Sequence, residues 1–134
     1  MTVNERYTAE DSLKLRTKEF ATRIMRLVDS LQNGTAEKVL ANQLLRSGTS
    51  VAVNYRSLCR ANSLKDFINK TSIIEAEADE TAFWLELLIE TDKVSAQKVT
   101  PLLTESNELV AIFVASRKTA QARQTRDSKI ATRR

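Results

Sequence analysis

The scarcity of turn-forming residues is the feature that most constrains this fold. The 134-residue chain contains two glycines and one proline, far below the usual share of both residue types. Because glycine and proline mark most turns, the chain is expected to form a few long elements. Its length indicates one domain that can bury a core.

The first helix is predicted over about residues 12–31. Its apolar residues recur at steps of three, four and seven, which line one face of a helix. Gly34 follows and is expected to stop this helix in the left-handed conformation. Thr35 is expected to cap a second helix, with Glu37 favouring its N-terminus. The apolar face of the first helix is Leu13, Phe20, Ile24, Leu27 and Leu31.

The segment RSGTSVAVNYR, residues 46–56, has the composition of a loop, even of a phosphate-binding one. The apolar spacing of three to four nevertheless continues through it to Leu58, which predicts the interior of the second helix. Gly48 inside a helix costs roughly 1 kcal/mol relative to alanine. Close approach of another helix is expected to offset this cost, with Phe83 or Trp84 placed over the small residues.

The third helix is predicted from Ser63 to about Thr91. Ser63, with Asp66 three residues later, fits a capping arrangement. A heptad-like seam follows in steps of three and four. The seam residues are Phe67, Thr71, Ile74, Ala78, Thr81, Leu85 and Leu88.

The fourth helix contains Pro101, which would cost about 3 kcal/mol deep inside a helix. Thr100 is therefore expected to be a cap, or a short helical turn at 95–99 to precede a kink. The chain beyond about Ala122 is expected to fray. The apolar residues of this helix are Leu102, Leu103, Leu109, Ile112 and Phe113.

Four long helices with short connections predict an all-α, antiparallel up-down-up-down four-helix bundle. The expected divisions are an N-terminal arm over 1–11, the bundle over 12–122 and a basic, disordered tail over 123–134. The chain has no apolar run long enough to span a membrane and no secretory signal at its N-terminus. Cys59 has no second cysteine to pair with, and a small core residue is favoured over a reactive thiol. These features predict a cytoplasmic protein.

Residue types that carry common catalytic chemistry are scarce. The chain has no histidine, which removes the usual general base and the commonest metal ligand. Gly48 has no second glycine nearby, as a phosphate-cradling loop requires. Arg56 and Arg60 lack the histidine that small helical ribonucleases of the toxin type pair with arginine. No catalytic residue, metal or cofactor is predicted, and the chain is interpreted as a non-enzyme.

The net charge of +4 is unevenly distributed. Residues 117–134 hold seven Lys or Arg and one acid, so residues 1–116 hold 14 bases and 16 acids. A basic tail can bind a polyanion, or it can be a solubilising terminus. The residues predicted to contact phosphate are Arg16, Arg23, Arg26, Arg117, Lys118, Arg123 and Arg126.

Residues 71–92 contain seven acids and no base. Glu77 and Glu80 are three residues apart and share a helix face. A polar network that fixes the register of the second and third helices is preferred to a catalytic site. Its predicted members are Arg46, Asn54, Arg56, Glu77 and Glu80.

Three segments in order, RSGTSVAVNYR, SLKDFINKTSIIEAEADETAFWLELL and ELVAIFVASRKTA, resemble the four-helix-bundle proteins encoded in intervening sequences of bacterial 23S rRNA genes. The resemblance covers about residues 12–122 and implies a ring-like homopentamer. Relatives include accessory proteins of diversity-generating retroelements, for which the resemblance implies a basic surface that binds nucleic acid and a reverse transcriptase partner. Those relatives are basic on the bundle itself, whereas this bundle is net acidic.

Two function classes follow. In the first, a non-enzymatic oligomer binds RNA or DNA through basic residues without reading sequence. In the second, the oligomer is a scaffold that binds a protein partner, and the tail only solubilises it. No membrane partner is predicted.

Overall fold

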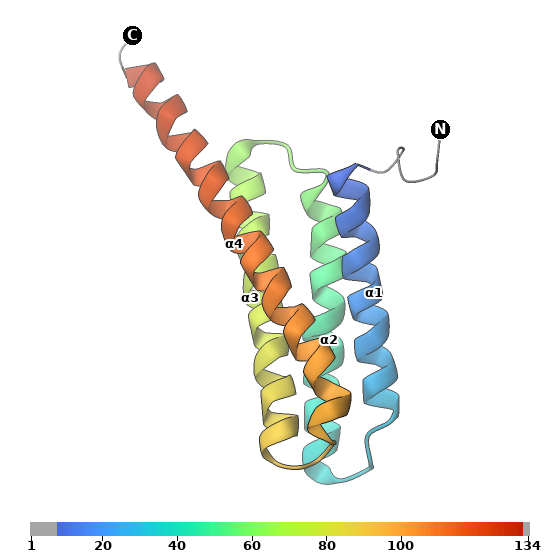
Figure 1. The fold of residues 1–134 in the computed structure, drawn as a ribbon. Coiled ribbons are helices and arrows are strands. Elements are labelled where there is room, and N and C mark those ends of the chain that lie inside the picture. The colour runs from blue at the N-terminus through green and yellow to red at the C-terminus, as the bar shows by residue number, and fades with distance from the viewer. Residues whose placement is uncertain (1–7, 133–134) are drawn as a thin grey trace.

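Four helices run alternately up and down in the computed structural model, which describes residues 8–132 (Figure 1). The predicted all-α, antiparallel four-helix bundle is confirmed. None of the helices in this described part is both long and apolar enough to cross a membrane. The helices are α1 (Ala9–Asp29), α2 (Thr35–Leu58), α3 (Leu64–Glu90) and α4 (Ala96–Thr132).

Helix α1 begins three residues earlier than predicted, because Thr8 caps it. The Thr8 hydroxyl accepts a hydrogen bond from the Asp11 backbone N–H at 3.1 Å, and the Asp11 carboxylate accepts one from the Thr8 backbone N–H. The prediction for Gly34 was wrong. Gly34 has an extended backbone with φ −77° and is itself the N-cap of α2, so Thr35 is the first helical residue. An N-cap residue requires this extended conformation.

The start of α3 agrees with the predicted cap. The Ser63 hydroxyl accepts a hydrogen bond from the Asp66 backbone N–H at 3.0 Å. The buried face of α3 differs from the predicted seam at its first position, because Ile68 is buried and Phe67 is only partly buried. Phe67 instead lines cavities at this end of the bundle.

Pro101 lies inside α4 without a separate preceding turn. Thr100 does not cap the helix, because its hydroxyl donates to the Ala96 carbonyl at 2.7 Å. Pro101 is the sixth residue of α4, so only the bond to the Gln97 carbonyl is lost, near an end where several N–H groups lack helical partners anyway. The predicted fraying beyond Ala122 also differs from the structure, since α4 stays helical to Thr132 with residues 121–132 exposed.

The segment RSGTSVAVNYR is a packing seam in the interior of α2. A Cβ atom added at Gly48 would lie 2.9 to 3.2 Å from side-chain atoms of Ile24 in α1. The residue over the glycine is therefore Ile24, and the prediction of Phe83 or Trp84 was wrong. On the α3 side, the Thr81 hydroxyl donates to the Ser47 hydroxyl at 2.8 Å, and both residues are fully buried.

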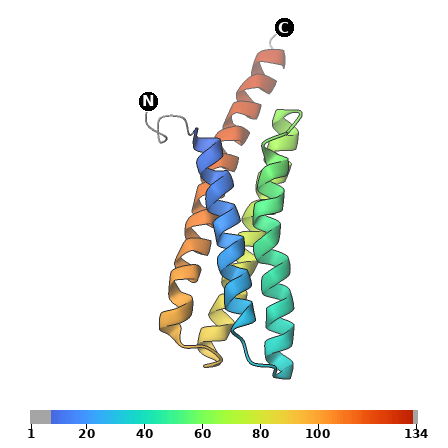
Figure 2. The same ribbon diagram turned by 90° about the vertical axis from the view of Figure 1, so that its right-hand side faces the viewer.

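Helix α4 packs closely on α3 and much less on α1. Figure 1 shows α4 leaning away from α1 towards the end at which α1 begins, called here the upper end. Both views show the last turns of α4 projecting beyond the loop that joins α2 and α3 (Figure 2). The upper end is therefore packed less completely than the middle, and it contains cavities.

Candidate nucleic-acid interface

Arg16, predicted to contact phosphate, is bound to carboxylates of α4. Its Nε and Nη2 donate to the two Glu105 oxygens at 2.8 and 2.6 Å, and Nη2 also lies 2.7 Å from Glu108. The Arg16 hydrogen bonds lower the pKa of the Glu105 carboxyl, against the opposing effect of burial. This bidentate pair joins α1 to α4 and occupies Nε and Nη2 of the guanidinium.

Arg117 is bound in the same way, to α3. Its Nε donates to Glu75 at 2.7 Å and its Nη2 to the other Glu75 oxygen at 3.3 Å, while Nη1 donates to Gln121. Two of the seven predicted phosphate contacts therefore hold helices together.

Arg23 and Arg26 meet a third cation that sequence reasoning missed. They line a hollow of about 360 Å³ between α1 and α4, together with Lys98. Between Thr8 and Thr132, no carboxylate lies within 4 Å of these three cations. Lys98 carries no signal in the sequence, because its proximity to α1 depends on how α4 packs.

The C-terminal part of α4 carries the remaining predicted contacts. Lys118, Arg123 and Arg126 are exposed, and none has an ion-pair partner among the described residues. Lys129, one turn further, is also exposed and adds to the same basic segment. Asp127 is the only acid on this part of the helix.

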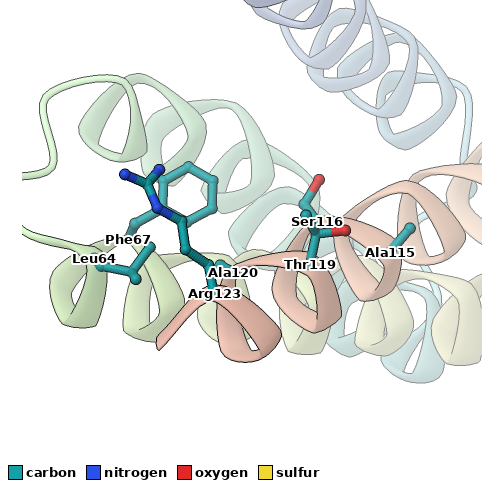
Figure 3. A pocket seen from close by; sticks show the side chains of 7 residues that line it. All are labelled: Leu64, Phe67, Ala115, Ser116, Thr119, Ala120 and Arg123. Carbon is teal, nitrogen blue, oxygen red and sulfur yellow. The ribbon is translucent and has the colours of Figure 1, made fainter. Parts of the chain in front are cut away.

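Arg123 also borders an apolar pocket of about 490 Å³ between α3 and α4. Figure 3 shows its side chain extending from α4 towards α3, where Leu64 and Phe67 form the opposite wall. The other wall consists of small residues of α4, including Ala115 and Ala120. The pocket therefore combines an apolar floor with one cation at its rim.

Three of the five residues predicted to form the polar network do so, namely Arg46, Glu77 and Glu80. Arg46 donates from Nη1 to Glu77 at 3.1 Å and from Nη2 to Glu80, which also accepts from the Trp84 indole at 3.3 Å. The hydrogen bond from Arg46 is the main cause of the lowered pKa of Glu80.

Asn54 and Arg56 lie outside this network. Asn54 donates to the Ser50 carbonyl of its own helix at 2.8 Å. Arg56 lies ten residues beyond Arg46 on α2, beside Lys70 of α3, because the two helices run in opposite directions. The correction follows from helix length, since ten residues span about 15 Å.

Cys59 lies directly after α2, in the wall of a cavity of about 320 Å³ that Leu13, Tyr55 and Phe113 also line. Burial raises the pKa of its thiol and that of the Tyr55 phenol. A raised pKa leaves less thiolate, the reactive form. The preferred interpretation as a packing residue is consistent with this environment. Residues 8–132 contain no group of three or more His, Cys, Asp or Glu side chains placed to hold a metal ion.

Comparisons with known proteins point to one family. The family model of the 23S rRNA-intervening sequence protein matches residues 13–115. A crystal structure of a protein of unknown function from Bacteroides thetaiotaomicron, described as a member of the S23 ribosomal protein family, is 40% identical with a TM-score of 0.74. The match covers 79% of this chain and 98% of that protein. No curated protein sequence matches the chain.

Proposed function

Because the chain belongs to the 23S rRNA-intervening sequence protein family, we propose that it is a non-enzymatic, oligomeric protein that binds RNA or DNA through phosphate contacts. The observation that carries this proposal is the basic end of α4. Four exposed cations without ion-pair partners in the described part of the chain lie between Lys118 and Lys129 of α4. They are Lys118, Arg123, Arg126 and Lys129.

The expected binding does not depend on base sequence. Lysine and arginine on a helix surface contact phosphates, which carry no sequence information. Stacking of unpaired bases requires exposed aromatic rings, and Phe83, 49% exposed on α3, is the one large exposed aromatic in residues 8–132. The cluster of Arg23, Arg26 and Lys98 supplies a second set of phosphate contacts, on the opposite end of the bundle from the α4 extension.

Self-association is part of the proposal. Val39 and Val53 of α2 are 55% and 65% exposed, and Ile73 and Phe83 of α3 are nearly half exposed. Large exposed apolar patches mark protein–protein interfaces. An oligomer, with the ring-like homopentamer as its expected form, would cover these residues and present several basic segments to one nucleic acid.

The test is binding of labelled structured RNA and duplex DNA at about 50 and 200 mM salt, measured by fluorescence anisotropy. The variant Arg123→Gln/Arg126→Gln is expected to bind about tenfold more weakly. Its salt dependence should be shallower, since each lost phosphate contact reduces the logarithmic slope by roughly 0.7 to 0.9.

The matched control is Lys38→Gln/Lys65→Gln, which removes two exposed charges from α2 and α3. If the control weakens binding as much as the α4 variant, binding is a net-charge effect and α4 is not the interface. If the unmodified protein binds neither nucleic acid at 50 mM salt, while light scattering still gives an oligomer, the proposal fails and a protein-binding scaffold is the better explanation.

A further inference from the structure

A hollow at the upper end of the bundle is lined almost entirely by cations. It has a volume of about 330 Å³ and opens where α1, the end of α2 and α3 meet. Sequence reasoning missed it, because its residues come from three separate segments. They are Lys14, Arg56, Ser57, Arg60 and Lys70.

The two lysines and the two arginines of this hollow differ in their partners. Lys14 lies 3.4 Å from Glu10, and Lys70 lies 2.8 Å from Asp66, each one turn away on its own helix. Neither Arg56 nor Arg60 has a carboxylate within 4 Å among residues 8–132. Four cations and two acids leave the hollow with a net charge of about +2.

Helix stability alone does not account for this arrangement. The helix dipole favours a cation in the last turn of α2, and Arg56 is that cation. Within the described residues, Arg60 then adds a second cation without a carboxylate partner at the same place, which costs stability. By contrast, three other arginines that face a neighbouring helix, Arg16, Arg46 and Arg117, each have a carboxylate opposite them.

We propose that this hollow is a phosphate-binding subsite. Arg56 and Arg60 supply the planar guanidinium donors that match phosphate oxygens, and the Ser57 hydroxyl is available as a further donor. Lys14 and Lys70 contribute charge at the rim. The inference rests on the proposed function in one respect: the phosphate it takes is a backbone phosphate of the bound nucleic acid.

The first experiment uses tripolyphosphate as the probe and the full chain as the protein. Thermal unfolding is followed with and without millimolar tripolyphosphate, at ionic strength matched with sodium chloride. The midpoint of the unmodified protein and of the control Lys38→Gln/Lys65→Gln should rise by several degrees, because a ligand that binds the folded state stabilises it. The midpoint of Arg56→Gln/Arg60→Gln should rise much less. Equal rises in all three proteins would overturn the subsite.

The second experiment separates the subsite from the proposed function. In RNA binding at about 50 mM salt, Arg56→Gln/Arg60→Gln should lose about tenfold in affinity and the control at most threefold. If RNA binds and the two variants lose equally, the subsite is wrong while the proposed function stands. If tripolyphosphate binding depends on the two arginines but neither RNA nor duplex DNA binds, the proposed function fails, and so does the assignment of this phosphate to nucleic acid.

Discussion

Arg46 and Arg56 lie ten residues apart on α2 and meet opposite surroundings. Arg46 faces Glu77 and Glu80 of α3, whereas Arg56 faces Lys70 of α3 and Lys14 of α1. The same residue type on the same helix is therefore neutralised in the middle of the bundle and left positive at the upper end. The opposing helix, and not the residue itself, decides whether a surface arginine stabilises the fold or is available to a ligand.

Packing differs between the same two regions. In the middle, Gly48 allows Ile24 to approach α2. The buried Thr81 hydroxyl there donates to the Ser47 hydroxyl, which itself donates to the Gln43 carbonyl. At the upper end, α4 leans away from α1, and cavities of about 320 and 490 Å³ lie beside α4. We therefore expect the middle to contribute more to stability than the upper end. Four predictions test this difference.

The largest expected effect is the loss of a side chain from the middle. Leu85→Ala removes a fully buried side chain of α3 and should lower the free energy of unfolding by about 3 kcal/mol. Leu64→Ala, in the wall of the apolar pocket at the upper end, should cost less than about 1 kcal/mol, because little new cavity is created. Urea unfolding followed by circular dichroism measures both. Equal losses would show that the upper end is packed as tightly as the middle.

The second prediction concerns Gly48. Gly48→Ala should destabilise the protein by up to about 2 kcal/mol, since the added Cβ overpacks against Ile24 although alanine is the better helix former. In the Ile24→Ala background the conflict is relieved, and the same substitution should raise stability by up to about 1 kcal/mol. Urea unfolding of the four proteins of this double-mutant cycle gives the sign of the change in unfolding free energy that Gly48→Ala causes in each background. A similar loss in both backgrounds would mean that another neighbour limits the space at Gly48.

The Gly48 region also shows how far the sequence could be interpreted. Steps of three to four run unbroken through residues 46–56, and they correctly predicted helix there. The partner of Gly48 could not be predicted, because three other helices can face a small residue and only the packed register selects Ile24. Arg16 illustrates the same limit for the candidate site. Its partner Glu105 is 89 residues away, so its charge suggested a phosphate contact when it is in fact occupied by an ion pair.

The basic hollow at the upper end was missed for a related reason. Lys14, Arg56 and Lys70 lie on three different helices. None of them belongs to a run of basic residues in the sequence, so no single segment indicated the hollow. Single-helix patterns describe which face of a helix is polar, but they do not describe which polar residues of different helices come together. The cations of α4 were easier to predict, since they follow one another within a single segment.

The third prediction uses the pH dependence of the Arg16–Glu105 pair. Because Arg16 lowers the pKa of Glu105 in the folded protein, the pair stabilises the fold above the ordinary glutamate pKa of about 4.3. This contribution is lost as the pH falls through the lowered folded value. Glu105→Gln should cost about 1 kcal/mol or less at pH 7, discounted because Arg16 is 35% exposed and solvent screens the pair.

The difference between Glu105→Gln and the unmodified protein should then shrink as the pH is lowered from about 5 to 3, in urea unfolding at each pH. Glu108→Gln is the matched control, since Glu108 contacts the same guanidinium but is 59% exposed, and it should have a smaller effect throughout. A difference that stays constant down to pH 3 would contradict an ionised Glu105 as the stabilising partner.

The smallest effect is also the most direct test of the contrast on α2. Arg46→Gln should lower the thermal midpoint by about 1 to 3 °C, because exposed ion pairs contribute little. Arg56→Gln should leave the midpoint unchanged or raise it slightly at low salt, since it removes like charge from the basic hollow. In nucleic-acid binding the order should reverse, with Arg56→Gln weakening RNA binding and Arg46→Gln leaving it intact. If both variants lower the midpoint and spare binding, Arg56 is a structural residue like Arg46, and the charge difference between the two regions has no functional meaning.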